Sequence, residues 1–540
     1  MLSEKPEVRT NEAGTKFWNA SFETFEVKAV IPVTAEPGDI INYGFEAPML
    51  VVLKDSLPVD EDAETYGTKT GLCTIASRKA GAVLFVAPKV SGGWKNCDES
   101  LFTELIANTK IHQYHEDGFA VLHNRFTHRC EGWAIRGAIF RTILFAKGEA
   151  ADYVAGKLMK NIQGDWLWGP GDVTESGVVL ENLSVVPDIR RRDIPVVSIS
   201  NSEEINRAIC ANADYVKVAE NDNFAEIYDE FSGRFMRWSG RLQDSVNFDA
   251  IGMVEEFAYE TVTTSKENRG DDEGTETHRI GYIAYYNKGL FDGTAKPMVV
   301  AFHGGGDSAM HIAQVSEWYR VAHDHDFLLI CVENHLNSTA TEMKEFIGKL
   351  IEKYDVDVTR IYASGFSMGG CKSWDLYQEY PEIFAGLAPM SATFEVGLNV
   401  FGQPAHHDIN QNTLVPIFYV GGEESPLPEL PFQALKCLER MKYVMKVNDI
   451  MLENKEDYEK QENWTNKVWG ISGDETEVFH DEVRDRDLTA QYFKSKDGVV
   501  YTSFGSVSRH GHECAYHSCE HAWQFLSRFA RVDGKIVICK

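Results

Sequence analysis

One serine stands between two glycines, at the boundary between an expected strand and an expected helix. Residues 360–364 form a short apolar, β-prone run, residues 365–370 read GFSMGG, and a helix-compatible stretch continues to Tyr380, just before Pro381. The glycines of this Gly-x-Ser-x-Gly pattern allow a sharp turn, so the hydroxyl of Ser367 projects above the sheet at a helix N-terminus. These residues predict a nucleophilic serine, although the pattern by itself also occurs by chance.

A glycine-rich loop upstream supplies the second part of this chemistry. Residues 297–302 form an apolar strand, and the sequence HGGGD follows it. Glycines at such a place let the backbone approach a substrate closely. We therefore expect an oxyanion hole that combines the N–H of Met368 with that of Gly304, Gly305 or Gly306. A phosphate-binding loop is the alternative, but the sequence contains neither GKS/T nor GxGxxG.

The general base is expected near the end of the sequence. In hydrolases built around such a turn, the acid and then the histidine follow the serine along the chain. Residues 499–504 read as the last core strand, a loop follows, and a closing helix includes residues 522–526. We predict that His512, directly after a glycine in that loop, is the base. His510 is the second candidate.

The same region offers a competing interpretation as a metal site. His517 and His521 are spaced by four residues, and Cys514 and Cys519 lie beside them. Sulfur and imidazole are the usual ligands of zinc. The paired Cys-x-x-Cys spacing of such sites is missing here, so the sequence predicts no metal and no organic cofactor.

The acid is expected in the loop after the preceding core strand. Residues 415–420 form that strand, and residues 421–426 (GGEESP) follow it. A carboxylate there would orient the imidazole and stabilise its charged form. We predict Glu424 for this role, with Glu423 as the alternative. Both carboxylates could instead be solvated side chains of a loop.

Four segments resemble the polyhydroxybutyrate depolymerase and feruloyl esterase group of α/β-hydrolases. They are DVDVTRIYASGFSMGG and PEIFAGLAPMSA, with AFHGGGD upstream and GHE downstream. The resemblance covers roughly residues 290–430 and the C-terminal segment. It implies an esterase that works through an acyl-enzyme, with Ser367 as nucleophile and His512 as base. The family usually has Asp in a GxxD pattern where this sequence has Gly-Gly-Glu-Glu, which leaves the acid open, and the resemblance names no substrate.

Composition places the chain among globular proteins and limits its partners. The 540 residues exceed one ordinary core, and the 43% hydrophobic and 25% charged content is typical of globular domains. A net charge of −29 argues against nucleic acid as a partner. No secretory signal and no membrane-spanning run is visible, so we expect a cytoplasmic protein without a membrane partner, whose ten cysteines are free thiols.

The two halves of the chain show a weak internal match. Three apolar runs of the first half align with runs of the second at nearly constant spacing: 82–88 with 298–304, 142–148 with 360–365, and 194–198 with 415–419. This indicates two α/β-hydrolase-like domains in tandem, 1–245 and 246–540. Any two α/β domains share apolar strands followed by glycine, which is the alternative explanation.

The first half lacks the chemistry of the second. In this alignment Ala150 takes the place of Ser367, and Asp152 takes the place of Gly369. No histidine occurs between Ile194 and Gly240, where the base would be. We therefore interpret residues 1–245 as a degenerate domain that has a structural or partner-binding role.

Residues 431–495 form an apparent insertion in the second half. This stretch has helical periodicity near its start, and its aromatic residues include Tyr443, Tyr458, Trp464 and Trp469. Insertions at that place often form a lid, so these residues are candidate substrate contacts. They could equally pack against the neighbouring domain.

Together these features predict a two-domain α/β protein whose second half is a serine esterase. The substrate would be a small-molecule or oligomeric carboxylic ester. A peptidase or an acyltransferase would use the same groups, and a binding protein without catalysis is a further alternative. The sequence indicates no oligomeric state.

Overall fold

The protein forms two compact units, Met1–Val246 and Asn247–Lys540, and each is described by itself. The computed structural model describes residues 7–33, 48–78, 81–98, 138–159, 175–238, 241–244, 246–270, 272–305, 307–399, 402–451, 462, 464–482 and 484–539. None of the helices in these ranges is both long enough and apolar enough to cross a bilayer.

The second unit is built on one large sheet. Its strands are β12 (Met253–Thr263), β13 (Thr277–Asn287), β14 (Lys296–Phe302), β15 (Leu328–Val332), β16 (Val356–Phe366), β17 (Gly386–Met390), β18 (Ile417–Gly422), β19 (Glu475–Asp481), β20 (Arg486–Lys494) and β21 (Val500–Val507). Their order across the sheet is β12-β13-β15-β14-β16-β17-β18-β21-β20-β19. The strands at its centre are apolar and buried on both faces, as parallel strands covered by helices must be.

The strand directions identify the type of fold. From β15 to β21 all neighbours are parallel, whereas β13 runs antiparallel to β12 and to β15. A mostly parallel sheet in this order, with the second strand reversed, is the arrangement of α/β-hydrolases. The second unit therefore has an α/β-hydrolase-type fold, as the sequence predicts.

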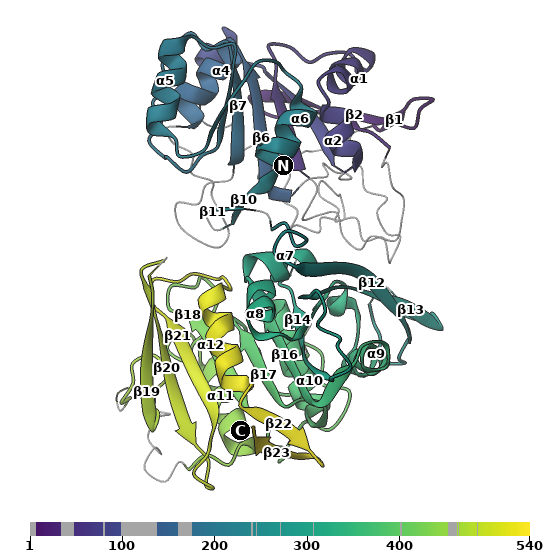
Figure 1. The fold of residues 1–540 in the computed structure, drawn as a ribbon, viewed down its shortest axis with the longest axis vertical. Coiled ribbons are helices and arrows are strands. Elements are labelled where there is room, and N and C mark those ends of the chain that lie inside the picture. Colours follow the sequence, from purple (N-terminus) through teal and green to yellow (C-terminus); the bar gives the residue numbers. More distant parts are fainter. Residues whose placement is uncertain are drawn as a thin grey trace. The chain divides into compact units, whose positions relative to one another are not determined.

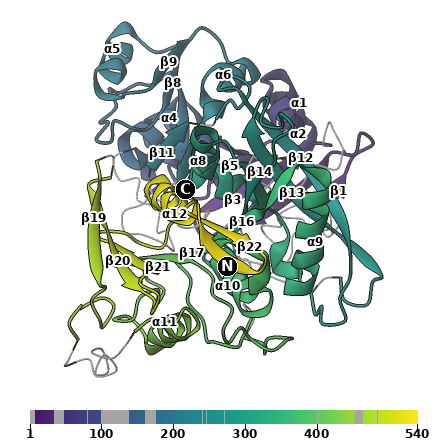
Figure 2. The ribbon, with the colours of Figure 1, turned by 60° about the horizontal axis from the view of Figure 1, so that its bottom comes forward.

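Helices cover both faces of this sheet. They are α7 (Ala309–Val315), α8 (Trp318–His325), α9 (Ala340–Lys353), α10 (Met368–Glu379), α11 (Leu435–Val447) and α12 (Tyr516–Leu526), with short turns η4 (His335–Asn337) and η5 (Pro381–Ile383) and a terminal hairpin β22 (Phe529–Val532) and β23 (Lys535–Ile538). Helices α8 and α12 pack against each other on one face, and α9 packs against β12 and α10 on the other (Figure 2). Helix α9 begins where Thr339 and Glu342 form a reciprocal capping box.

The segment 431–495 extends the sheet and the core. Its described residues include α11 and the antiparallel strands β19 and β20, which continue the sheet beyond β21 (Figure 1). Trp469 is 2% exposed and stacks on Phe504, and Tyr443 packs edge-on against Tyr377 of α10. These contacts place the aromatic side chains of Tyr443 and Trp469 in the core, so they correct the prediction of these two residues as substrate contacts. Tyr458 lies outside the described residues.

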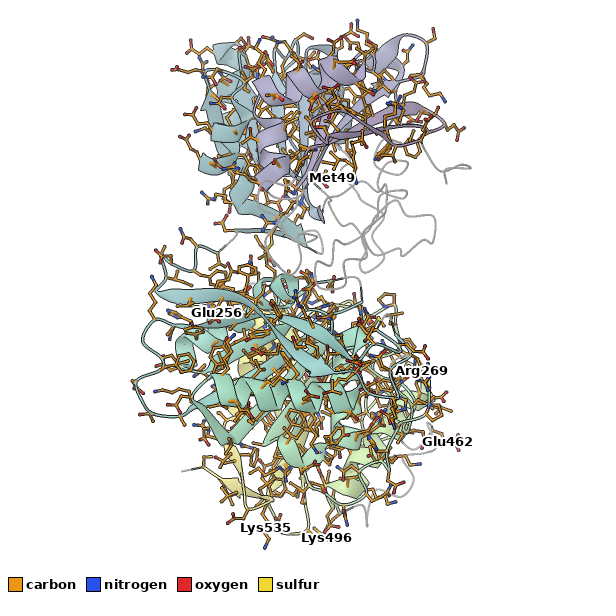
Figure 3. The ribbon with its side chains drawn as sticks, turned by 90° about the vertical axis from the view of Figure 1, so that its right-hand side faces the viewer. Met49, Glu256, Arg269, Glu462, Lys496 and Lys535 are labelled. Carbon is orange, nitrogen blue, oxygen red and sulfur yellow. The ribbon has the colours of Figure 1, made fainter. Side chains whose placement is uncertain are left out.

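The first unit contains a second sheet with its own helices. Its strands are β1 (Arg9–Thr10), β2 (Lys16–Ser21), β3 (Phe25–Ile31), β4 (Pro48–Leu53), β5 (Ala82–Pro88), β6 (Ala138–Lys147), β7 (Glu175–Glu181), β8 (Val196–Ile199) and β9 (Val216–Ala219), and a separate hairpin joins β10 (Phe235–Trp238) to β11 (Arg241–Asp244). Its helices are α1 (Asp60–Lys69), α2 (Leu72–Arg78), η1 (Gly93–Asn96), α4 (Glu149–Tyr153), η2 (Val154–Leu158), α5 (Glu203–Asn212), α6 (Phe224–Glu230) and η3 (Ser232–Arg234). Met49 of β4 is fully buried within this sheet (Figure 3).

The two sheets share one strand order. From β2 onward the first sheet runs β2-β3-β5-β4-β6-β7-β8-β9, which corresponds strand by strand to the second sheet from β12 to β21. This order corrects one part of the expected alignment. Strand β5 (82–88) corresponds to β15, and β4 corresponds to β14, because β4 and β14 are the strands that lie next to β6 and β16. Apolar composition alone could not distinguish these neighbouring strands.

Candidate active site

Ser367 forms the turn between β16 and α10 in a strained backbone conformation. Its φ and ψ angles are 53° and −119°, a region that non-glycine residues rarely adopt. Its N–H donates a hydrogen bond to the carbonyl oxygen of Met390, at the end of β17, over 3.0 Å. The turn thus holds the hydroxyl at the carboxyl edge of the parallel strands.

The flanking glycines are required by close backbone contacts. A Cβ atom on Gly369 would lie 2.1 Å from the carbonyl oxygen of Phe302, and one on Gly365 would lie 2.2 Å from that of Gly369. No side chain fits at such distances. The Gly-x-Ser-x-Gly pattern therefore reflects how tightly α10 packs on β14 and β16.

His512 lies within hydrogen-bonding distance of the serine. Its Nε2 is 2.8 Å from Oγ of Ser367, although the two residues are far apart in sequence. It is 3% exposed, and its ring packs at 4.8 Å from that of Phe366. The loop after β21 brings it there, since β21 ends at the same edge of the sheet as β16.

The carboxylate beside His512 is Glu429. Its Oε1 lies 2.5 Å from Nδ1 of His512, and the residue is 1% exposed. The N–H of Gly422 donates to its Oε2 over 2.7 Å, and the hydroxyl of Ser425 donates to Oε1 over 2.6 Å. These bonds hold the carboxylate where it can accept a hydrogen bond from Nδ1–H of His512.

The predicted acids do not occupy this position. Glu424 directs its backbone N–H to the carbonyl of His510, and Glu423 accepts a hydrogen bond from the hydroxyl of Ser506 over 2.7 Å. The chain turns back after β18, so the residue that meets the imidazole comes later in the loop than either prediction. Nothing in the sequence marks Glu429 above its neighbours, because a loop conformation decides the choice.

His510, the alternative base, belongs to a separate buried cluster. Its Nε2 lies 3.0 Å from the carbonyl oxygen of Glu513, and its Nδ1 lies 2.5 Å from the Arg486 guanidinium. Burial lowers the pKa of His510. The ring is therefore a neutral structural group in this fold, with both nitrogens engaged away from Ser367.

The other histidines of this region also have structural contacts. His517 lies 3.1 Å from the carbonyl oxygen of Phe479, and His521 stacks on the ring of the same residue at 3.8 Å. The sulfur atoms of Cys514 and Cys519 are 3.7 Å apart. Among the residues that the structure describes, no group of three or more His, Cys, Asp or Glu side chains is arranged to hold a metal.

The loop after β14 packs against the serine turn. A Cβ atom on Gly305 would lie 2.4 Å from Sδ of Met368, and one on Gly304 would lie 3.0 Å from the ring of Phe366. Met368 opens α10, and N–H groups of a first helical turn have no acceptor inside the helix. The predicted oxyanion donors thus lie beside one another, while Gly306 lies outside the described residues.

Two buried polar residues support this loop. The ring nitrogens of His303 lie 2.6 Å and 2.5 Å from the carbonyl oxygens of Gly304 and Glu333, and burial lowers the pKa of this histidine. Burial also raises the pKa of Asp307 to about 8; the Gly304 backbone lowers it and the Glu333 carboxylate raises it further. Since the Gly304 backbone interacts with Asp307, Gly305 is the better placed of the two glycines to face a substrate.

The first unit has a glycine at the position that corresponds to the serine. Gly148 follows β6 with φ and ψ of 60° and −125° and precedes α4, as Ser367 follows β16 and precedes α10. This corrects the predicted correspondence of Ala150 with Ser367 by two residues. Ala150 and Asp152 lie within α4, and the Asp152 carboxylate accepts hydrogen bonds from the backbone and hydroxyl of Ser184.

The second unit thus holds a continuous chain of hydroxyl, imidazole and carboxylate, and the loop of Gly304 and Gly305 packs beside it against Phe366 and Met368. In such an arrangement the imidazole can remove the serine proton, and the carboxylate can stabilise the imidazolium that forms. Backbone N–H groups aimed at the same point stabilise negative charge on an attacked carbonyl oxygen. This geometry is suited to acyl transfer.

Comparison with known proteins finds that this chain is similar to esterases. No family model matches the chain. Over 249 residues this chain is 20% identical to the bifunctional acetylxylan esterase/xylanase XynS20E of Neocallimastix patriciarum. The matched region covers 44% of this chain and 32% of that protein. The chain thus spans about a third of the length of this curated relative.

Solved structures of esterases are also similar to this chain, at low sequence identity and low TM-score. An acetyl xylan esterase from Aspergillus awamori has 12% identity and a TM-score of 0.34, over 50% of this chain and 99% of that one. A ferulic acid esterase has 14% identity and a TM-score of 0.26, over 37% and 86%. The resemblance to serine esterases predicted from the Ser367 segment is confirmed by the sequence relative, and the fold assignment rests on the strand order.

Proposed function

We propose that the second unit is a serine esterase that hydrolyses a carboxylic ester through an acyl-enzyme. Ser367 is the nucleophile, His512 the general base and acid, and Glu429 the residue that orients and stabilises the imidazole. The N–H groups of Met368 and of the Gly304–Gly305 loop form the oxyanion hole. The hydrogen-bonded series from Ser367 through His512 to Glu429, with distances of 2.8 Å and 2.5 Å, carries this proposal.

The first half of the reaction acylates the serine. Nε2 of His512 takes the proton of Ser367 as Oγ bonds to the ester carbonyl carbon, and the carbonyl oxygen becomes an oxyanion. The backbone donors stabilise that charge. The bond to the alkoxy group then breaks, and the proton on Nε2 passes to the departing alcohol.

The second half returns the enzyme to its starting state. His512 removes a proton from water as the water oxygen attacks the acyl carbon, and a second oxyanion forms in the same hole. This intermediate expels Oγ of Ser367, which recovers its proton from His512, and the free acid leaves. All proton transfers use protein groups, so the steps need no metal or organic cofactor.

The name of the sequence relative suggests a substrate class. That protein is described as an acetylxylan esterase, so an acetyl ester of a sugar or sugar polymer is our first candidate. A peptidase uses the same three residues and is the second candidate. The first unit, with Gly148 in place of the serine, is proposed to be a non-catalytic copy with a structural or partner-binding role.

A panel of chromogenic esters tests this function. Wild type, Ser367→Ala and Glu429→Gln are assayed with acetyl, butyryl, octanoyl and feruloyl esters and with a peptide anilide. We expect ester turnover in wild type, none above background in Ser367→Ala, and strongly reduced turnover in Glu429→Gln. Equal ester turnover in wild type and Ser367→Ala excludes the proposed nucleophile, and anilide turnover without ester turnover favours the peptidase.

A further inference from the structure

A cavity of about 300 Å³ lies in the second unit, away from Ser367. Its walls come from the turn between β12 and β13, from residues 336–340 after β15, from α10 and from the loop after β17. Asp375 and Glu379 of α10 line it, whereas Ser367 does not. At 1.5 Å per residue these two residues lie about 12 Å and about 18 Å along the helix axis from the serine, and Lys372, which also lines the cavity, lies about 7.5 Å from it. The cavity is therefore separate from the proposed ester site.

Two buried carboxylates in its wall each have one oxygen without a hydrogen-bond donor. Asp375 is 3% exposed, and the side chain of Glu379 is also 3% exposed. Within the described residues, Oδ1 of Asp375 and Oε2 of Glu379 have no hydrogen-bond partner. The other oxygen of Glu379, Oε1, accepts the N–H of His406 over 3.4 Å, and Nε2 of His407 lies 3.9 Å from Oε2. The residues are four apart on one helix and therefore share a face. Burial raises the pKa of Asp375 to about 6 and also raises that of Glu379.

A fixed ammonium group makes a cation an unsuitable occupant. Lys372 is 3% exposed, and its Nζ lies 3.4 Å from Oδ2 of Asp375 and donates to the carbonyl of Ser338 over 2.6 Å. It neutralises one of the two carboxylates and repels a second positive charge. A hydroxyl group avoids this conflict, because it can donate to an unpaired carboxylate oxygen without bringing charge into the cavity.

The remaining walls carry polar groups that are held in place. The Asn268 amide donates to the carbonyl of Asn337 over 3.0 Å and to Glu342 over 3.1 Å, and Gln403 lines the cavity on another side. The side chain of Arg269 is 54% exposed, so this wall reaches the surface of the unit (Figure 3). The volume is at the lower end of the 300–1,000 Å³ that small-molecule sites occupy.

We propose that this cavity binds a neutral, hydroxyl-rich ligand of the sugar class, whose hydroxyl groups donate to Asp375 and Glu379. The ligand fits the polar lining, the volume and the local charge balance together. Binding itself does not depend on the ester site. Only its role rests on the proposed function: a sugar unit held here would anchor a polymeric ester at a distance from the bond that is cleaved.

The experiment measures binding of methyl β-D-xylopyranoside, which carries no ester, by ligand-observed NMR titration. Wild type and Ser367→Ala should bind it with equal affinity, with a dissociation constant on the order of 1 mM. Glu379→Met keeps the side-chain length but removes the acceptor, and it should weaken binding at least about tenfold, or roughly 1.4 kcal/mol. The matched control is Glu439→Met on α11, where the side chain is 62% exposed, and its binding should not change.

The outcomes separate this proposal from the proposed function. Loss of ester turnover in Ser367→Ala with unchanged glycoside binding supports both, and binding without any ester turnover in wild type supports the cavity alone. The absence of saturable binding overturns the cavity proposal, as does equal binding by wild type and Glu379→Met. Displacement of the glycoside by spermidine would also overturn it, since the site would then prefer a cation. If Glu379→Met does not fold, Asp375→Asn removes the charged acceptor with little change of shape and should weaken binding as well.

Discussion

Gly148 and Ser367 adopt the same backbone conformation at corresponding places in two separate sheets. Their φ and ψ angles are 60° and −125°, and 53° and −119°. The N–H of each donates to the carbonyl of the last residue of the next strand, Glu181 over 2.9 Å and Met390 over 3.0 Å. The first unit thus has the same turn as the second unit has at Ser367, but with no side chain on it.

A serine at this turn should not restore activity. A Cβ atom on Gly148 would have no other atom within 4 Å, so Gly148→Ser has room for its side chain. It would place a non-glycine residue at positive φ, and we expect a loss of stability of about 1–2 kcal/mol. Because no histidine follows β9 in this unit, Gly148→Ser in a Ser367→Ala background should show no ester hydrolysis. Denaturant unfolding and a chromogenic ester assay check both parts; recovered turnover would contradict the non-catalytic assignment.

Glu429→Gln should reduce kcat by about 10²- to 10⁴-fold. The amide cannot stabilise the imidazolium and favours the wrong tautomer of His512. Steady-state kinetics with an acetyl ester measure the ratio of kcat between wild type and variant. Glu424→Gln is the matched control, since the backbone N–H of Glu424, which the substitution leaves in place, donates to the carbonyl of His510, and its kcat should stay near that of wild type. A larger loss in Glu424→Gln than in Glu429→Gln would reverse the assignment of the acid.

Two glycine substitutions should change the thermal stability of the second unit in opposite directions. Gly369→Ala places a Cβ atom 2.1 Å from the carbonyl oxygen of Phe302, so we expect loss of the serine turn, of ester turnover and of several degrees in Tm. Gly348 lies within α9, and a Cβ atom there meets nothing within 4 Å. Gly348→Ala should therefore stabilise the unit by about 1 kcal/mol. Thermal unfolding of both variants tests this pair, and equal shifts in Tm would contradict it.

Asp307 should make stability depend on pH. Its pKa is raised by burial from 3.8 in the unfolded chain to about 8 in the fold, so between these values the native state holds a proton that the unfolded state has released. The free energy of unfolding should then fall as pH rises through this window, by at most about 1.4 kcal/mol for each pH unit. Above about pH 8 it should level off. Asp307→Asn should remove this slope and gain stability relative to wild type towards pH 8. Unfolding midpoints between about pH 5 and pH 8 measure it; parallel slopes in both proteins would contradict the prediction.

The sequence predicts those parts of the site that depend on short, local patterns. Ser367 lies within a strand, a tight turn and a helix whose residue types are all distinctive, and His512 follows a glycine in the last loop. Glu429 could not be found this way. Its position depends on how the loop after β18 folds back through the bonds from Gly422 and Ser425, which leave no pattern in the residue types.

The strands of the first unit show a similar limit to what the sequence can predict. The sequence pairs β6 with β16 and β8 with β18, as the strand order does, because each is an apolar run at the expected spacing, but it displaces the turn after β6 by two residues. Strand β5 was matched with β14 instead of β15, since adjacent buried parallel strands have the same composition. The order of strands across a sheet depends on crossover connections, which apolar periodicity does not encode.

The hairpin β19–β20 has a mechanical consequence for the proposed base. Among the described residues of the first unit, β9 ends its sheet on this side, whereas in the second unit β20 continues the sheet beyond β21, the counterpart of β9. Arg486 of β20 forms an ion pair with Glu513, and the carbonyl of its neighbour Asp487 accepts the N–H of Ser508. The loop that carries His512 is thus braced from a strand that has no counterpart among the described residues of the first unit, and these contacts restrain the position of the imidazole relative to the serine.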